Sequence, residues 1–431
     1  MLATKSRISR SAFGAIRVAL LAQSPMHYQV PLYRLLASDP RIDFTAIFAS
    51  SAGVRSHDPG YNRSIVWDVD LLSGYKSIFL KRANKNELGG GFLSNHDVDV
   101  VAAVSRGRYE VLWLHGYNSL THQLALFTQR ARGKPVLLRE EQTLLHGRSA
   151  WKLVAKKILL PLLMGSTFGL FIGSENRRWL RHYGIPDNRL FFAPYAVENE
   201  RFQAEATRLA NERDQVRAEF GLRKAGGPVI LFMGRMIDKK QPLFVLEAFR
   251  RVRERQECQL LMVGSGPLEN EVRSAIIRDK IQDVSMAGFL NQTEISRAYA
   301  SADIFVLASR AHETWGLVVN EAMNFGLPII LSDKVGCAPD LLRDTRNGFI
   351  VSSAEPSQLA KRLATLVASE GLRRSFGRAS FQLINQWTHQ MAVEGVIAAV
   401  RCAVGEPRWE AASGDTRTMR EASLGRQSTD D

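Results

Sequence analysis

Residues 309–328, SRAHETWGLVVNEAMNFGLP, are the stretch best suited to chemistry. Glu313 and Glu321 are separated by seven residues, and Gly316 between them is expected to open a helix that reaches about Phe325. A helix N-terminus after a glycine is an anion site, because free N–H groups and the helix dipole face the ligand. Two carboxylates beside it do not bind phosphate themselves. They suit hydroxyl-rich groups on either side of a phosphate, such as a ribose and a hexose.

Two further elements of the second half follow predicted strands. The segment 234–240, GRMIDKK, places Arg235 and Lys240 where two cations would flank a diphosphate. The segment 263–267, VGSGP, supplies Gly264 and Gly266 at another strand-to-helix junction. It lacks the third glycine of a dinucleotide fingerprint, so an NAD-binding interpretation is weak.

The first half offers fewer candidates. His115 ends a predicted strand at 111–114, and Asn118 follows it in WLHGYNS, so both are candidates for the cleft, with a structural loop histidine as the alternative. His27, after the first predicted strand, is a second candidate for the acceptor side. Glu140 and Glu141, at the end of another strand, point to the same rim, but sequence does not separate them from ordinary surface charge.

The elements that position these residues follow one pattern. Short, continuously apolar runs alternate with helical periodicity, six runs in each half of the chain. Strands buried on both faces and alternating with helices indicate parallel sheets. The expected fold class is therefore α/β, with two Rossmann-like, doubly wound domains that place ligands at the carboxyl ends of their strands.

The domain limits follow from composition. Residues 1–205 are expected to form the first domain and residues 206–386 the second, because 202–227 is charged and poor in strand formers. A helix at 387–404 is expected to cross back to the first domain. Residues 405–431 lack apolar periodicity and are predicted to be a disordered tail.

Composition excludes several classes. The chain has 431 residues, 45% hydrophobic and 23% charged, an ordinary globular balance. Its three cysteines, Cys258, Cys337 and Cys402, lie far apart in no ligand-like spacing, which argues against a zinc site or a disulfide framework and predicts no metal. No membrane-spanning segment is predicted. The net charge of +14 lies mostly in the first half and favours an anionic partner there, with solubility alone as the alternative.

One segment combines charge with apolar residues. Residues 147–164, GRSAWKLVAKKILLPLLM, carry Lys152, Lys156 and Lys157 beside a tryptophan and many leucines. A basic amphipathic helix suits docking at an anionic membrane surface. The alternative is an ordinary helix whose leucines pack on the sheet.

The motifs of the second half are together similar to the C-terminal domain of retaining glycosyltransferases of family 4. The resemblance rests on GRMIDKKQP, LLMVGSGPLE, ADIFVLAS, ETWGLVVNEAMNFGLP, SDKVGCAPDLL and NGFIV, in order over 229–351. It implies the GT-B fold, with a donor-binding second domain and an acceptor-binding first domain. The first half resembles bacterial surface-polysaccharide enzymes more loosely.

The resemblance also implies residue roles. Glu313 contacts the donor sugar, Glu321 binds the ribose, Arg235 and Lys240 hold the diphosphate, and His115 lies near the anomeric centre. The other expected donor-binding residues are Trp315, Gly316, Leu317, Val318, Gly264 and Gly266. On the acceptor side the resemblance favours His27 and Asn118. It implies no metal and no cofactor beyond the nucleotide-diphosphate sugar, which is the donor substrate.

The expected function is therefore transfer of a sugar from a nucleotide-diphosphate sugar to a hydroxyl, with retention at the anomeric carbon. The expected acceptor is a lipid-linked saccharide, in polysaccharide or glycolipid biosynthesis, and the expected location is the cytoplasm, on the inner face of the cytoplasmic membrane. Two alternatives stay open. One is a GT-B synthase acting on a small soluble acceptor. The other is a basic nucleic-acid-binding protein, although no aromatic-and-basic RNA motif is present.

Overall fold

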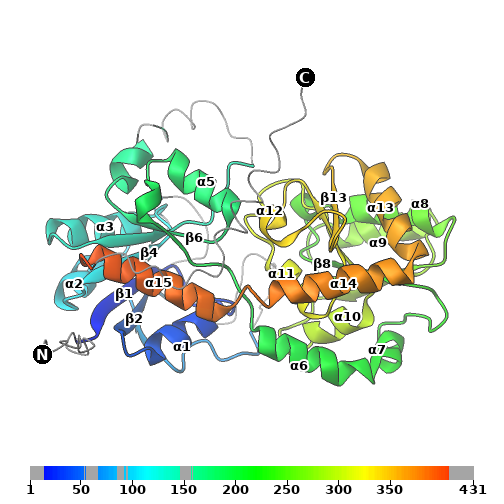
Figure 1. Ribbon diagram of the computed structural model, residues 1–431, viewed down its shortest axis with the longest axis horizontal. Helices are drawn as coiled ribbons and strands as arrows, with labels where there is room; N and C mark the ends of the chain where they lie inside the picture. The colour runs from blue at the N-terminus through cyan, green and yellow to red at the C-terminus, as the bar shows by residue number, and fades with distance from the viewer. Residues whose placement is uncertain are drawn as a thin grey trace, which may run out of the picture.

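The computed structural model describes residues 14–52, 54, 67–84, 92–93, 96–145, 157 and 159–406. Within them the chain forms two α/β lobes that lie side by side, each built around a parallel sheet (Figure 1). The lobe on the left holds the first half of the chain together with α15 (His389–Ala403), and the lobe on the right holds most of the second half. The expected α/β class with two doubly wound sheets is confirmed.

The first sheet has seven strands in the order β3-β2-β1-β4-β5-β6-β7, all paired in parallel. The strands are β1 (Ile16–Ala22), β2 (Ile42–Phe48), β3 (Lys76–Phe79), β4 (Val111–His115), β5 (Val136–Arg139), β6 (Phe168–Phe171) and β7 (Leu190–Phe192). Along β1, Val18 and Leu20 face one core while Ala19 and Leu21 face the other. This burial on both faces explains the continuously apolar runs.

The prediction of six strands in this half is wrong by one. The additional strand, β3, has the sequence KSIF and lies at the edge of the sheet, where Lys76 and Ile78 are exposed. An edge strand with one open face needs no continuous apolar run, so the pattern that identified the other strands does not detect it.

The second sheet has six strands in the order β10-β9-β8-β11-β12-β13. The strands are β8 (Val229–Met233), β9 (Gln259–Val263), β10 (Val284–Gly288), β11 (Ile304–Leu307), β12 (Ile329–Ser332) and β13 (Gly348–Val351). In both sheets the order reverses at the first strand, between β1 and β4 and between β8 and β11. Ligands of doubly wound sheets bind at the carboxyl ends of the strands at this switch point.

Helices cover both faces of each sheet. In the first lobe they are α1 (Val30–Ser38), α2 (Asp99–Arg106), α3 (Leu120–Ala131), α5 (Ser174–His182) and α15, with the short η1 (Asp187–Arg189). The remaining helices are α6 (Asn199–Ala210), α7 (Arg213–Glu219), η2 (Asp238–Lys240), α8 (Pro242–Arg253), α9 (Glu269–Arg278), α10 (Ile295–Ser301), α11 (Leu317–Asn324), α12 (Ala338–Leu341), α13 (Pro356–Ala368) and α14 (Glu370–Ile384).

The last helix, α15, returns to the first sheet. It packs on α1 and on strands β5 to β7, and its buried residues Val393, Val396 and Val400 repeat at helical spacing. In Figure 1 it continues the line of α14 and passes from the right lobe onto the left one. Most of the predicted tail, residues 407–431, lies outside the described residues.

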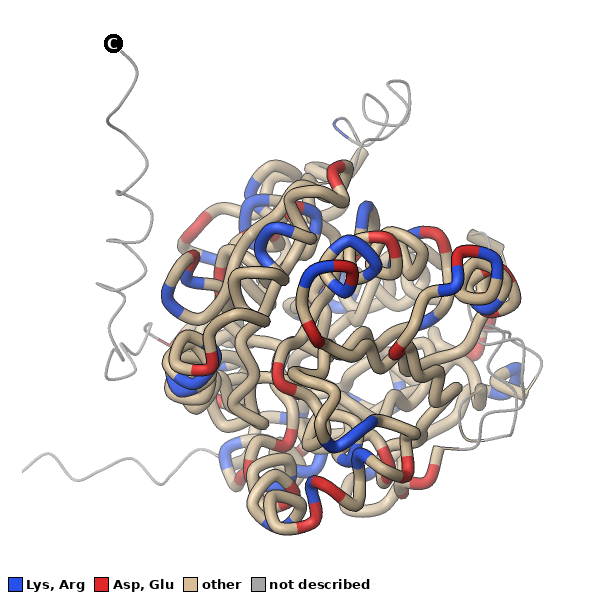
Figure 2. The backbone as a smooth tube through the Cα atoms, turned by 90° about the vertical axis from the view of Figure 1, so that its right-hand side faces the viewer, with Lys and Arg blue, Asp and Glu red and all other residues tan. Residues whose placement is uncertain are grey.

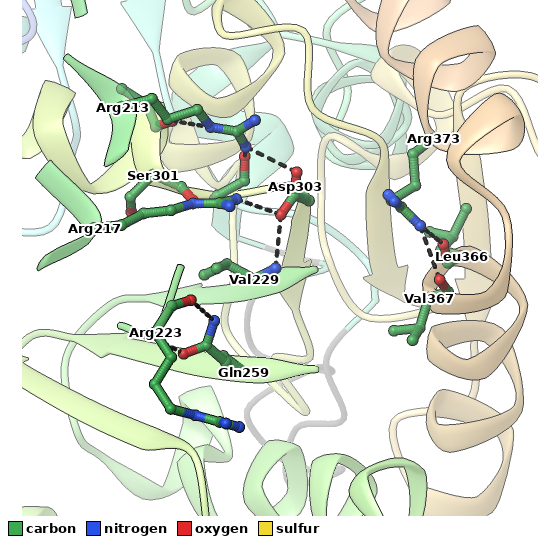
Figure 3. Close-up of polar contacts among 12 residues, drawn as sticks. Arg213, Arg217, Arg223, Val229, Gln259, Ser301, Asp303, Leu366, Val367 and Arg373 are labelled. Atoms are coloured by element: carbon green, nitrogen blue, oxygen red, sulfur yellow. Dashed lines mark hydrogen bonds and ion pairs between the residues drawn. The ribbon is translucent and has the colours of Figure 1, made fainter. Parts of the chain in front are cut away.

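The charged segment between the sheets forms α6 and α7, which pack on α10 of the second lobe. Arg213 and Arg217 of α7 both donate to Asp303, whose carboxylate also accepts from the backbone N–H of Val229 at the start of β8 (Figure 3). Burial acts to raise the pKa of Asp303, but the two guanidinium groups outweigh it and hold that pKa below its ordinary value. The ion pairs thus fix α7 at the amino ends of the two central strands, β8 and β11.

Charged residues of both signs alternate over the face that the second lobe presents in Figure 2, with no broad region of one sign. Arg250 illustrates the pattern, since it pairs with Glu247 and Glu254 on its own helix. Among the described residues, no helix combines the length and apolarity needed to cross a membrane.

Candidate active site

Lys240 and Glu313 meet at the switch point of the second sheet. Lys240 ends η2, after β8, and Glu313 lies on the loop after β11, the neighbouring strand. The Lys240 Nζ donates to Glu313 Oε2, and the hydroxyl of Ser309 donates to the same oxygen at 2.9 Å. Only 12% of the Lys240 side chain and 11% of the Glu313 side chain are exposed. The structure therefore joins two sequence-predicted residues as one buried ion pair.

The pair has a defined charge state. Burial acts to raise the pKa of Glu313, but the Lys240 ammonium, with help from Lys239 and Ser309, outweighs burial and holds that pKa below its ordinary value. The carboxylate is therefore ionised at neutral pH. The backbone also holds it: the carbonyl of Glu313 accepts from the N–H of Gly336, and Glu313 forms a bridge to Val335.

Arg235 and Lys239 lie on the same loop. Arg235 is half-buried, and its charge, together with that of Lys240, lowers the pKa of Lys239 in addition to the larger effect of burial. Lys239 donates to the carbonyl of His312 at 3.0 Å. Three cations thus lie in one region beside the buried carboxylate of Glu313. Such a loop can bind a multiply charged anion.

The N-terminus of α11 starts three residues after Glu313. Gly316 caps it with φ 99°, a left-handed conformation that favours glycine, and offers no side-chain cap. The first N–H groups of a helix have no partner within it, so those of Leu317 and Val318 are suitable for an anion. Both side chains pack against the hydrophobic core.

Glu321 lies one turn into α11. It is buried, and the hydroxyl of Tyr299 on α10 donates to its Oε2 at 2.6 Å. Burial raises the pKa of Glu321, while the hydrogen bond and the charge of Arg201 oppose that rise. Glu313 precedes the first residue of α11 and Glu321 lies within the helix, so the two carboxylates flank the helix start along the chain.

The loops after β8 and β9 lie directly on one another. The N–H of Gly234 donates to the carbonyl of Val263, and the N–H of Met236 donates to that of Ser265. A Cβ on Gly264 would lie 2.0 Å from the carbonyl oxygen of Gly234. A Cβ on Gly266 would lie 2.6 Å from that of Met236. These glycines, predicted to bind the donor, therefore have a packing role: they let one loop support the Arg235–Lys240 loop.

Trp315 is placed differently from its prediction. Its side chain is 2% exposed, its Nε1 donates to Asn320 at 2.9 Å, and its ring lies 5.3 Å from that of Trp387. A Cβ on Gly173 of the first lobe would lie 2.3 Å from the Trp315 ring. The Trp315 indole thus packs between the two lobes.

A second contact between the lobes is polar. Asp340 of α12 accepts from the backbone N–H of Ser174 at 2.9 Å and from its hydroxyl at 2.5 Å. It therefore caps the N-terminus of α5 across the lobe boundary. Burial raises the pKa of Asp340 to about 6 despite these hydrogen bonds.

The predicted site residues of the first lobe that follow β4 lie at the switch point of the first sheet. His115 ends β4, and its Nε2 hydrogen-bonds Glu141 Oε1 at 2.7 Å. Asn118 is exposed, and its neighbour Ser119 caps α3 by accepting from the N–H of His122. The structure therefore brings His115 together with Glu141, whereas the Asn118 side chain is exposed on the loop that follows β4.

His27 lies between loops of the two lobes. Its ring is 4.1 Å from that of Trp67, which in turn lies 6.5 Å from Phe289 of the second lobe. Burial, aided by the charge of Arg201, lowers the pKa of His27 to about 4, so the ring is neutral at physiological pH.

Sequence reasoning missed four residues that the structure places around these sites: Arg139, Tyr299, Asp340 and Lys239 as a partner of the His312 loop. Arg139 is the clearest case, because an arginine inside an apolar strand run is a detectable signal. Of the three lysines predicted to dock on a membrane, Lys152 and Lys156 lie outside the described residues, and Lys157 is exposed.

Comparison with solved structures defines the fold class. A glycosyltransferase from Rickettsia africae aligns with a TM-score of 0.68 at 14% identity, over 92% of this chain and 100% of that one. Alr3699/HepE of Anabaena, solved in complex with UDP, aligns with a TM-score of 0.67 at 13% identity, over 89% and 98%. The fold is GT-B, as expected.

Sequence comparison then identifies the second half. Residues 214–383 match the family model "Glycosyl transferases group 1". Spore coat protein SA of Bacillus subtilis is 32% identical over 177 residues, 39% of this chain and 46% of that protein. D-inositol 3-phosphate glycosyltransferase of Segniliparus rotundus is 29% identical over 230 residues, 52% and 49%. The aligned part thus covers less than half of these relatives. Residues 214–383 are thus similar to group 1 glycosyltransferases, within a chain that has the GT-B fold.

Proposed function

We propose that this protein transfers a sugar from a nucleotide-diphosphate sugar to a hydroxyl group, with retention of configuration at the anomeric carbon, as the resemblance to family 4 implies. The observation that carries the proposal is the buried Lys240–Glu313 pair beside the start of α11, at the switch point of a group 1 glycosyltransferase domain. Alr3699/HepE, which shares the fold, was solved with UDP and with UDP-glucose.

In this proposal the diphosphate lies between the Arg235–Lys240 loop and the N-terminus of α11. Negative charge develops on the leaving diphosphate in the transition state, and preorganised cations and N–H groups stabilise such charge most effectively. An ammonium carries three protons, so Lys240 can hold Glu313 with one and still donate to phosphate oxygens. Glu313 then faces the donor sugar, and Glu321 accepts from ribose hydroxyls.

Retention and metal independence belong to the same proposal. We assign no covalent nucleophile, so the acceptor hydroxyl attacks on the face that the diphosphate leaves, and a diphosphate oxygen takes its proton. The bond from the anomeric carbon to the diphosphate oxygen breaks, and the bond to the acceptor oxygen forms. The cationic loop supplies the positive charge that a divalent ion would otherwise provide.

A donor screen tests this proposal. The purified protein is incubated with a panel of nucleotide sugars, and slow release of nucleoside diphosphate is measured with and without EDTA. We expect turnover of one donor class, unaffected by EDTA, and NMR of the product should show the donor's anomeric configuration. Loss of turnover in EDTA with recovery in Mn²⁺ would contradict the metal-free mechanism, and no turnover of any donor would contradict the function.

We propose that the acceptor is a lipid-linked saccharide, reached from the cytoplasmic face of an anionic membrane. Support comes from the basic segment with Lys152, Lys156 and Lys157 and from the positive charge of the first half. Each lysine near an anionic surface contributes about 1 kcal/mol. Flotation with anionic vesicles should show binding that weakens with salt and falls in a triple Lys→Gln variant. Equal binding by the variant, or none by the wild type, would favour a soluble acceptor.

A further inference from the structure

We propose that Glu141 and Arg139 are positioning residues for His115: Glu141 fixes the Nε2–H tautomer of the ring, and Arg139 supplies the buried charge that keeps Glu141 in place. The Nδ1 lone pair of His115 then accepts a hydrogen bond from a sugar hydroxyl in the cleft. The last step rests on the proposed function, and the first two concern the protein alone.

The backbone places the three residues together. His115 and Arg139 are register partners at the ends of the neighbouring parallel strands β4 and β5. Partners in register point to the same face of a sheet, and Trp113 and Leu137, two residues earlier, both lie in the core beneath α1 and α15. Glu141 follows Arg139 by two residues. The cluster therefore lies at the carboxyl edge of the first sheet, beside its switch point.

The hydrogen bond determines the tautomer. An ionised carboxylate only accepts, so the Nε2 that lies 2.7 Å from Glu141 Oε1 must carry the proton. In the neutral ring, Nδ1 then has a lone pair. Within the described part of the chain, Glu141 is the one side chain bonded to this ring, and the side chain remains 16% exposed. The ring is thus anchored on one side and accessible on the other.

Arg139 is a buried cation with no hydrogen-bond partner. It is 0% exposed, and among the described residues none accepts from its Nε, Nη1 or Nη2. The guanidinium lies over the ring of Tyr195, 4.7 Å from its centroid. Arginine stays charged in proteins, and burial of a charge without a partner is strongly unfavourable. An electrostatic role explains why this buried strand position carries an arginine.

Glu141 is the anion in the field of Arg139. Burial acts to raise the pKa of Glu141, but the hydrogen bond from His115 and the charges of His115 and Arg139 outweigh it, and the pKa lies below its ordinary value. Four other titratable groups near the cluster, two tyrosines and two histidines, are uncharged near neutrality. Burial raises the pKa values of Tyr28 and Tyr33, and it lowers those of His122 and His389 to about 4. Arg139 and Glu141 thus set the local charge.

Contacts lead from Arg139 toward the lobe proposed to bind the donor. Tyr195, which lies over Arg139, accepts at its carbonyl from Asn320 Nδ2 at 3.3 Å, and Asn320 is on α11. The same Asn320 accepts from the Trp315 indole. Arg139 is therefore linked through Tyr195 to the helix that starts at the proposed diphosphate site.

NMR on the substrate-free, full-length protein tests the positioning directly. Long-range ¹⁵N–¹H correlation of the labelled histidines, with His115 assigned by H115N, should show the Nε2–H tautomer in the wild type near neutral pH. E141A should give a mixture of tautomers, and R139M should do the same as the pH falls. R139K should retain the wild-type pattern, and K134M, which removes an exposed cation before the same strand, is the matched control. An Nδ1–H tautomer in the wild type, or an unchanged spectrum in E141A, would overturn the proposal.

Kinetics provides the second readout. Loss of a residue that orients a functional histidine is expected to lower kcat by about 10- to 100-fold. The KM for the donor should change little in E141A, because the residues proposed to bind the donor nucleotide are on the second lobe. In R139M the acid limb of the kcat–pH profile should move to higher pH. R139K should restore the wild-type profile. A change in KM alone, or an acid limb of the R139M profile that does not shift, would contradict the positioning role. The expected tautomers without turnover of any donor would refute the proposed function and leave the positioning intact.

Discussion

The Lys240–Glu313 pair offers a quantitative test of the site. Lys240→Met removes the ammonium but keeps most of the side-chain volume, so the main change is an unpaired carboxylate at a position where 11% of the Glu313 side chain is exposed. Breaking a buried ion pair by removing one partner costs about 3–5 kcal/mol. The Ser309 hydroxyl and Lys239 still act on Glu313, so we expect the lower end of this range.

The loss should depend on pH in a definite direction. In the wild type the pKa of Glu313 is lowered below its unfolded value, so its contribution to stability is present above that value and is lost as the pH falls through the folded pKa. In K240M the main opposing charge is gone, and burial raises the pKa. The penalty of the buried carboxylate is then relieved by protonation as the pH falls. The difference in unfolding free energy should therefore be largest near neutral pH and smaller in acid.

Urea unfolding, followed by both tryptophan fluorescence and far-UV circular dichroism, measures this difference, and coincident transitions check two-state behaviour. K240M/E313Q should recover most of the lost stability, because it removes the unpaired charge. The control is K334M, which breaks the exposed Lys334–Asp333 pair and should change stability by about 1 kcal/mol or less. A K240M protein as stable as the wild type, or a loss that does not vary with pH, would refute the reasoning.

Three further predictions follow from single features. E321A should weaken UDP binding in calorimetry by about 10- to 100-fold, since a hydrogen bond to a charged group is worth about 1.5–3 kcal/mol, and unchanged affinity would remove Glu321 from the site. G264A should lower the melting temperature, because its Cβ would meet the Gly234 carbonyl at 2.0 Å, while G371A, with open space at its Cβ, should not. The pKa of Asp340 is raised to about 6, so its stabilising contribution is lost as the pH rises through that value. In calorimetric melting, the wild type should therefore lose stability relative to D340N as the pH rises from about 4 to about 6, and a constant difference would contradict this.

The sequence predicted the second sheet closely because its strands are buried on both faces. Runs such as 228–234 and 258–264 became β8 and β9, and the glycine after the β11 loop became the cap of α11. The failures have physical causes too. The edge strand β3 lacks a continuous apolar run, and Trp315, expected at the donor site, belongs to the packing between the lobes. Contacts between lobes join residues far apart in the chain, so local periodicity contains no signal for them.

The sequence by itself determined the two parallel sheets, their strands apart from the edge strand β3, and the loops that carry Arg235, Lys240, Glu313 and Glu321. These follow from local apolar periodicity and from glycines at helix starts. Only the tertiary structure decided which side chains are partners. In the folded protein Lys240, and not Lys239, forms the ion pair with Glu313, and His115 hydrogen-bonds Glu141. The reason is that crossover connections bring strand ends together at the switch points, and pairing there depends on distances across the sheet that spacing along the chain does not encode.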